Sequence, residues 1–281
     1  MTKILVTGAS GFIGKNLIEH LRAHNFQIFE KNSLDGDLAD VNTWSNFNRA
    51  QILIHLAGNT FVPESWENPE KFMKSNLHGV ICALEYCRKH NTRLIYLSSY
   101  LYGNPKYLPI PETAELIANN PYALSKKMAE EVCKHYAKFF GIKITIFRPF
   151  NVYGKGQSEK FLIPSIIHQI NLGNVISVKD LKPKRDYIYI KDLTSLLIRA
   201  IDVPLDFETF NIGTGLSYSV GELINRIQSI MGKTLEVKVT DEMRKAEIMD
   251  TQADIKKAFS VFGWTPKYSL NDGLKEMILN K

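Results

Sequence analysis

The chain has 281 residues, of which 44% are hydrophobic and 23% are charged. This composition is typical of a globular protein with a large core and excludes intrinsic disorder, and no run approaches the roughly 18 apolar residues of a membrane span. The net charge of +6 does not indicate nucleic-acid binding, because the Lys and Arg residues are scattered and form no basic stripe, so we expect neither nucleic acid nor a membrane as a partner.

Short apolar runs alternate with helical patterns along the first half of the chain. The runs are rich in β-branched residues and are bounded by Gly, Asn or Ser. Such an alternation predicts an α/β fold with a parallel sheet covered by helices on both faces, because right-handed crossovers place the helices there. The predicted strands are 3–7, 26–30, 51–58, 93–99 and 143–147, and the predicted helices are 12–24, 69–90 and a segment from Pro121.

The alternation loosens after about residue 155. We expect a Rossmann-type, doubly wound dinucleotide-binding domain over 1–155, to which 186–214 return. Residues 156–185 and 215–281 are expected to form a smaller, discontinuous substrate-binding lobe. Its predicted elements are a loop and helix over 156–174, a strand at 234–239 and two short helices near the end. A strand leading into a helix over 185–201, a strand at 208–213 and a helix from Ser219 to Met231 are also predicted.

A glycine-rich turn, TGASGFIG, lies between the first strand and the first helix. Gly8 permits a tight turn, Gly11 allows close approach of a pyrophosphate, and Gly14 allows close contact between helix and strand. The helix that begins at Phe12 and Ile13 then offers free N–H groups and a positive partial charge to an anion. This context predicts dinucleotide binding.

The residues after the second predicted strand bear on which dinucleotide is bound. Asn32, with Lys31 beside it, would tolerate the 2′-phosphate of NADP, whereas Glu30 would oppose it if its side chain turned inward. We therefore expect NADP or NAD, with a preference for NADP. Asp37, followed by Leu38, is a candidate acceptor for the adenine amino group, and its alternative role is a helix cap.

The cysteines and the N-terminus bear on the cell compartment. Cys82, Cys87 and Cys133 have neither the pattern of a disulfide framework nor the spacing of metal ligands. Gly8 and Gly11 interrupt the N-terminal apolar run too early for a signal peptide. We therefore expect a reduced cytoplasmic location and no metal site.

A tyrosine and a lysine stand four positions apart at the start of the helix predicted from Pro121. Proline suits the first helical turn, and Tyr122 and Lys126 then lie on one helical face. Taken alone, this spacing is more typical of two ordinary surface side chains than of a reactive pair.

The order of the motifs resembles that of the extended short-chain dehydrogenase/reductases, in their branch that modifies nucleotide sugars. The resemblance covers nearly the whole chain. It is carried by TGASGFIG, HLAG, SSYLYG, YALSK, RPFNVYG, KRDYIYIKDL and NIGTG.

The resemblance implies a catalytic role for Tyr122, Lys126 and Ser98. In the family the tyrosine is the acid/base, the lysine lowers the phenol pKa and holds the nicotinamide ribose, and the serine bonds the reacting oxygen of the substrate. An unperturbed tyrosine is almost wholly protonated at neutral pH, so a nearby cation would be useful. The groups suit hydride transfer at C4 of a hexose.

The resemblance also implies binding residues for the cofactor and for a nucleotide-diphosphate sugar. Arginine fits bidentate phosphate recognition better than lysine does. The implied cofactor residues are Leu56, Ala57, Pro149 and Phe150, and the implied substrate residues are Ser99, Asn151, Arg185 and Arg244, the last with Glu247 in an Arg-x-x-acid element.

Two departures from the family pattern narrow the chemistry. Ser99 and Tyr100 stand where the 4,6-dehydratases carry Asp and Glu, so dehydration is disfavoured. Thr60 stands where some 4-epimerases have a Lys, and 281 residues is nearer the length of 4-keto reductases. We therefore expect a 4-keto (deoxy)sugar-nucleotide reductase. A 4-epimerase with tightly bound NAD is the alternative, and a non-catalytic NAD(P)-binding regulator is a remote one. The family also implies a homodimer and a role in cell-surface polysaccharide biosynthesis.

Overall fold

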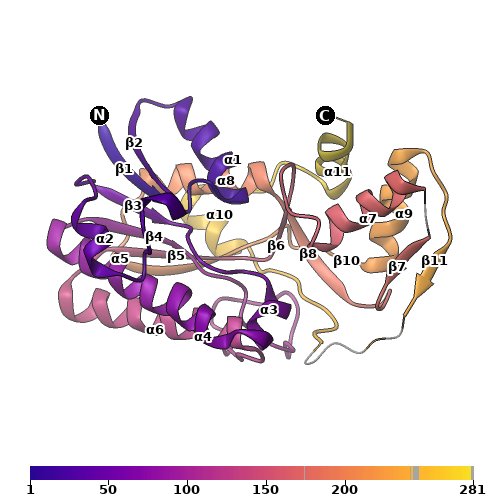
Figure 1. Cartoon of the computed structure of the whole chain (residues 1–281), viewed down its shortest axis with the longest axis horizontal. Coiled ribbons are helices and arrows are strands. Elements are labelled where there is room, and N and C mark those ends of the chain that lie inside the picture. The colour runs from indigo at the N-terminus through magenta and orange to yellow at the C-terminus, as the bar shows by residue number, and fades with distance from the viewer. Residues whose placement is uncertain (174, 241, 243–246, 280–281) are drawn as a thin grey trace.

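A parallel sheet forms the centre of the larger part of the molecule (Figure 1). The computed structural model describes residues 1–173, 175–240, 242 and 247–279. Within these ranges, the central sheet has the strand order β2-β1-β3-β4-β5-β9, and every neighbouring pair is parallel. Its strands are β1 (Thr2–Thr7), β2 (Phe26–Lys31), β3 (Ile52–His55), β4 (Arg93–Leu97), β5 (Ile144–Pro149) and β9 (Phe207–Ile212).

Helices cover both faces of this sheet, as the alternating pattern predicts (Figure 1). Side chains that alternate along the strands enter two different cores: Ile4 and Val6 of β1 belong to one core, and Leu5 to the other. The first core includes residues of α1 (Phe12–Arg22), α8 (Ile190–Ile201) and α10 (Lys256–Phe262). The second includes residues of α2 (Val41–Ser45), α5 (Gly79–His90) and α6 (Pro121–Phe140).

The helix predicted over 69–90 is not uniform. It consists of α4 (Pro69–Phe72), a π-helical segment (Met73–His78) and α5. A π-helical turn inside an α-helix shifts the side chains that follow it, and such turns are frequent at functional sites. A short helix, α3 (Val62–Glu67), precedes α4 and was not predicted.

The smaller part of the molecule lies beyond the carboxyl ends of the central strands (Figure 1). A sheet of order β10-β8-β6 joins the two parts, and β11 pairs with β7. Ser219 caps α9 through a capping box with Glu222, which confirms the predicted start of that helix. The elements are β6 (Asn151–Tyr153), α7 (Leu162–Leu172), β7 (Ile176–Val178), β8 (Lys184–Tyr189), β10 (Ser217–Ser219), α9 (Val220–Met231), β11 (Val237–Val239) and α11 (Leu270–Leu279).

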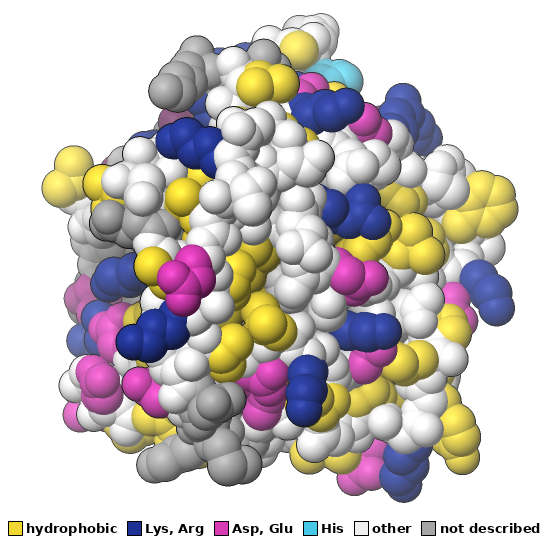
Figure 2. All heavy atoms as spheres, turned by 90° about the vertical axis from the view of Figure 1, so that its right-hand side faces the viewer, with side chains coloured by type: hydrophobic (Ala, Val, Ile, Leu, Met, Phe, Trp, Pro, Cys, Tyr) yellow, Lys and Arg dark blue, Asp and Glu magenta, His cyan; other side chains and the backbone are white. Residues whose placement is uncertain are grey.

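Charged side chains of both signs are interspersed on the outer face of this part (Figure 2). A single basic patch does not form on the face that the figure shows. Within the described ranges, no helix combines the length and the hydrophobicity that crossing a membrane requires.

A buried carboxylate ties three segments together where the two parts meet. Asp186 of β8 accepts hydrogen bonds from the backbone N–H groups of Thr214 (2.7 Å), Gly215 (2.9 Å) and Ala253 (3.1 Å). Burial raises the pKa of Asp186, and these donors act against that rise. The turn after β9 is therefore fixed against β8.

Candidate active site

The glycine-rich turn packs against the end of the neighbouring strand β3. Gly8 has φ +75°, and a Cβ atom there would lie 2.7 Å from the backbone nitrogen of Ala57. A Cβ atom on Gly14 would lie 2.1 Å from the carbonyl oxygen of Gly8. The tight turn predicted at Gly8 is confirmed, and the close contact at Gly14 is with the backbone of this turn. Because β1 and β3 are neighbours and their helices lie on opposite faces, the turn occupies the switch point where such sheets bind nucleotides.

The turn provides what a dinucleotide phosphate would need. The α1 N-cap residue, Gly11, contributes no capping side chain, and the first turn of α1 carries no acidic residue. The N–H groups of this turn therefore face no competing carboxylate from their own helix. These features fit the predicted cofactor role of Gly8, Gly11, Phe12, Ile13 and Gly14.

The residues at the end of β2 and in the turn after it are held by local ion pairs and a cap. Glu30 turns to the surface, where its carboxylate lies 2.8 Å from Arg22. Lys31 lies 3.1 Å from Asp35, and Asn32 uses its side chain to cap the 3₁₀ turn that follows. Glu30 is therefore directed away from the position in which it would oppose a 2′-phosphate. Asp35, which sequence reasoning missed, already neutralises part of the Lys31 charge.

Asp37 is not the cap of α2, because Asp40 has that role. The Asp37 carboxylate accepts a hydrogen bond from the N–H of Ala39 (3.0 Å) and pairs with Lys74 (2.8 Å). The Lys74 ammonium contributes most to lowering the pKa of Asp37. The carboxylate is thus ionised and half-exposed, and Leu38 beside it packs against the second core.

Helix α6 begins as predicted and brings Lys126 beneath the sheet edge. Pro121 occupies the first turn, and the Asn120 side chain accepts a hydrogen bond from the N–H of Ala123. Lys126 is buried, and its ammonium donates to the Leu97 carbonyl (3.0 Å) at the end of β4. A Cβ on Gly58 would lie 3.7 Å from Lys126 Nζ, so the lysine lies directly behind the loop that touches the glycine turn.

Burial dominates the protonation of this tyrosine–lysine pair. It lowers the pKa of Lys126 to about 8 and raises the pKa of Tyr122 to about 12. The Lys126 ammonium donates to the Leu97 carbonyl, and its effect on the phenol pKa stays a prediction. A hydrogen bond from Ser99 lowers the pKa of Tyr122 and so opposes part of the effect of burial.

The two serines after β4 have different surroundings. The Ser99 hydroxyl contacts Tyr122, whereas Ser98 Oγ is buried and has no hydrogen-bond partner in the described part of the chain. Sequence reasoning assigned the catalytic position to Ser98 and a substrate contact to Ser99. The contact between Ser99 and the phenol was not predicted, and the role of Ser98 toward the substrate oxygen stays a prediction.

The predicted substrate residues gather around a tyrosine. The Tyr100 hydroxyl donates a long hydrogen bond (3.5 Å) to Asn151, and its ring stacks on Phe150 at 5.0 Å between ring centroids. Tyr100 lies near both Tyr122 and Arg185. It therefore stands between the predicted acid/base and the predicted phosphate ligand, a position that its sequence context did not reveal.

Arg185 is already engaged in the structure. Its guanidinium pairs with Glu247 at 2.5 Å and donates to the Ile248 carbonyl (2.6 Å). The predicted partner Arg244 lies outside the described residues. An incoming phosphate would have to share Arg185 with Glu247 or displace it.

Two further polar residues support the site and were missed by sequence reasoning. Buried Asn76, in the π-helical segment, accepts from the N–H of Asn59 (2.8 Å) and donates to Asn59 O and Ser125 Oγ, both at 3.0 Å. His55 of β3 bonds Thr7 Oγ1 at 2.8 Å, and burial lowers its pKa to about 3. In the described part of the chain, no group of three or more His, Cys, Asp or Glu residues is arranged to hold a metal ion.

Comparison with known proteins identifies a family match and full-length relatives. Residues 4–213 match the model of the NAD dependent epimerase/dehydratase family. A putative UDP-glucose 4-epimerase of Methanocaldococcus jannaschii is 32% identical, with coverage of 98% of this chain and 97% of that protein. GDP-6-deoxy-D-mannose reductase of Pseudomonas aeruginosa is 31% identical, with coverage of 98% and 96%.

A solved structure agrees with these relatives. RMD from Pseudomonas aeruginosa, complexed with NADPH, superposes with a TM-score of 0.91 at 28% sequence identity, covering 100% of this chain and 98% of that one. The six-stranded sheet that the described residues form is thus the Rossmann-like sheet of these enzymes.

Proposed function

The chain belongs to the NAD dependent epimerase/dehydratase family, and on that basis we propose that it is a 4-keto (deoxy)sugar-nucleotide reductase. It is an enzyme that modifies sugar nucleotides with NADP or NAD as its cofactor. The reaction type within the family and the identity of the sugar belong to the proposal.

The observation that carries the proposal is the convergence of Tyr122, Ser99 and Lys126 behind the glycine turn. The reduced nicotinamide would supply a hydride to the C4 carbon of the 4-keto sugar. Tyr122 is protonated at neutral pH, as an unperturbed tyrosine also is, and burial raises its pKa to about 12; it would donate the proton to the developing alkoxide. Ser99 would stabilise the phenolate that remains, and Lys126 would hold the ribose. Ser98 stays the proposed ligand of the substrate oxygen.

The residues after Ser98 argue against dehydration. Elimination of water from a hexose needs an acid and a base, and Ser99 and Tyr100 are neutral groups at this position. Tyr100 instead forms an aromatic surface with Phe150, against which a sugar ring could lie.

The phosphates and the cofactor would be held at opposite ends of the site. We assign the nucleotide diphosphate to Arg185 and Asn151, with Arg244 as a further ligand. We assign the adenosine 2′-phosphate to Lys31 and Asn32, because Glu30 is ion-paired at the surface. NADPH is accordingly the proposed reductant.

A 4-epimerase is the second candidate, and the sequence identity to a putative UDP-glucose 4-epimerase favours it. The two functions differ in cofactor turnover. A reductase consumes NADPH and releases NADP, whereas an epimerase keeps its dinucleotide and shows no net consumption.

The deciding experiment has two measurements. Denatured, purified protein is examined for released NAD, and the native protein is then incubated with NADPH and a panel of 4-keto and 4-hydroxy sugars attached to UDP, GDP, dTDP or CDP. Stoichiometric NADPH oxidation with one 4-keto substrate supports the reductase. Stoichiometric bound NAD, together with interconversion of 4-hydroxy epimers, would replace it with the epimerase.

We also propose a cytoplasmic homodimer. Apolar side chains at helical spacing remain exposed along the outer face of α6, including Leu124, Met128 and Phe139. A second copy could cover this face. Light scattering of the wild type and of Met128→Glu tests this, and a wild-type monomer at micromolar concentration contradicts it.

A further inference from the structure

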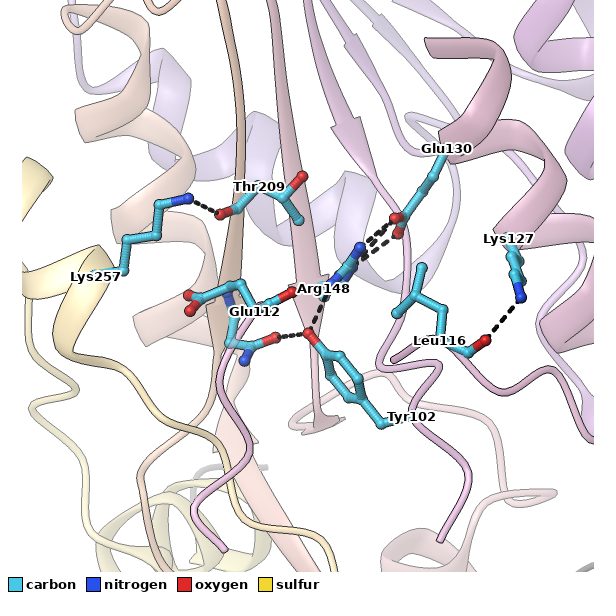
Figure 3. Close-up of polar contacts among 9 residues, drawn as sticks. Tyr102, Glu112, Leu116, Lys127, Glu130, Arg148, Thr209 and Lys257 are labelled. Carbon is cyan, nitrogen blue, oxygen red and sulfur yellow. Dashed lines mark hydrogen bonds and ion pairs between the residues drawn. The ribbon is translucent and has the colours of Figure 1, made fainter. Parts of the chain in front are cut away.

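A buried ion pair lies one helical turn beyond Lys126. Glu130 of α6 and Arg148 of β5 are 5% and 6% exposed. Arg148 Nη2 lies 2.6 Å from one carboxylate oxygen of Glu130, and Arg148 Nε lies 3.1 Å from the other. This bidentate geometry joins α6 to β5 of the central sheet (Figure 3).

A network fixes the arginine from its other side (Figure 3). Arg148 Nη1 donates to the Tyr102 hydroxyl (2.8 Å) and to the Glu112 carbonyl (3.2 Å). Tyr102 in turn donates to Asn211 of β9 (2.6 Å). Arg148 therefore cannot move without breaking contacts to three segments, and the orientation of Glu130 is fixed with it.

The helix places this pair where it acts on the catalytic pair. Tyr122, Lys126 and Glu130 follow one another at intervals of four, on the same face of α6. Glu130 is the charged group with the largest effect in keeping Lys126 protonated against the effect of burial. The Lys126 ammonium makes its hydrogen bond to Leu97 rather than to Glu130, so the influence acts through space.

The other titratable groups that face Lys126 carry no charge near pH 8. These groups are His55 of β3, Tyr96 of β4, and Tyr122 and Cys133 of α6. Burial lowers the pKa of His55 to about 3 and raises the pKa of Tyr122 to about 12. Burial also raises the pKa values of Tyr96 and Cys133. Among the described residues, the Glu130–Arg148 pair is thus the charged neighbour of Lys126.

We propose that Glu130 is a positioning residue that maintains the ammonium form of Lys126, and that Arg148 limits the strength of this effect. The proposal rests on the proposed function only for its consequence in catalysis. Removing the carboxylate leaves a second buried cation near Lys126, and removing the guanidinium leaves an unpaired carboxylate there. The two substitutions should therefore shift the protonation equilibrium of Lys126 in opposite directions.

The test is an NMR titration of the protein without added ligands, labelled at its lysine side chains, in which Lys126 is assigned by its absence in Lys126→Met. Glu130→Gln is expected to move the Lys126 titration midpoint down by about 1 pH unit, and Arg148→Met to move it up by a similar amount. Glu131→Gln is the matched control, because this exposed residue loses the same charge one position away. It should leave the midpoint unchanged.

Structural damage alone cannot produce opposite shifts. Equal shifts in one direction, or no shift in either variant, would overturn the proposal. If Arg148→Met does not fold, Glu130→Asp replaces it: retention of the charge should keep the midpoint near that of the wild type, and a shift as large as that of Glu130→Gln would overturn the proposal.

The catalytic consequence is measured separately. In Glu130→Gln, the alkaline loss of kcat/KM should move down in pH together with the Lys126 midpoint. Opposite midpoint shifts in a protein that turns over no sugar nucleotide would sustain this inference and reject the proposed function. A normal NMR response with an unmoved pH profile would reject the catalytic consequence.

Discussion

Replacement of Ser99 by Ala tests which serine acts on the tyrosine. The substitution removes the hydrogen bond that lowers the pKa of Tyr122, so that pKa rises further above 10. A hydrogen bond to a charged group contributes about 1.5–3 kcal/mol, and each 1.36 kcal/mol changes a rate tenfold. We therefore expect kcat in Ser99→Ala to fall by about 10- to 150-fold.

The pH profile separates this role from a simple loss of substrate binding. In the direction of alcohol oxidation, Tyr122 acts as a base, and activity rises with pH as the phenol ionises. Ser99→Ala should move that rise to higher pH. Ser98→Ala is the matched control: Ser98 Oγ has no partner among the described residues, so this variant should leave the midpoint of the rise in place. A midpoint that moves in Ser98→Ala and stays fixed in Ser99→Ala would refute the reasoning.

Three further predictions concern the cofactor site and stability. Lys31→Ala should raise the KM for NADPH about tenfold and leave the KM for NADH nearly unchanged. Asp35→Asn removes the ion pair that holds Lys31, so it should lower the KM for NADPH. Equal effects on the two cofactors would contradict this prediction. Because burial lowers the pKa of His55 from 6.5 to about 3, the unfolded chain binds the extra proton below pH 6.5. Stability to urea should thus fall by about 1.6 kcal/mol between pH 6.5 and 5, and less in His55→Gln. Gly14→Ala should lower the free energy of unfolding in urea by about 3 kcal/mol, because the new Cβ would lie 2.1 Å from a backbone oxygen. Gly79→Ala is the control: its Cβ would lie no closer than 3.9 Å to another atom, so it should not lower the free energy of unfolding.

The strands and most helices could be predicted because their signals are local. Buried parallel strands produce apolar runs such as residues 3–7, and Pro121 and Ser219 mark helix starts by their own chemistry. The π-helical segment at 73–78 could not, because its sequence is compatible with an ordinary α-helix. Asn76 becomes a support of the site only through that extra residue per turn.

The candidate site was predictable where it depends on position and unpredictable where it depends on pairing. The i, i+4 spacing placed Tyr122 and Lys126 on one face, and the same spacing extended once more would have found Glu130. The engagement of Arg185 by Glu247 joins segments 62 residues apart, and no local pattern encodes it. Burial, which raises the pKa of Tyr122 in the structure, could not be read from the spacing of residues along the chain.

Strand β9 reaches the central sheet only after the chain has passed through β6, α7 and β8. A fragment that stops at residue 155 would consequently lack it, and β5 would offer a bare row of N–H and C=O groups to any other chain in solution. Phe147, which packs against Phe210 of β9, would become accessible to water as well. Truncation at that point should therefore yield aggregates, and the shortest N-terminal piece that retains every strand of the described sheet ends no earlier than Ile212.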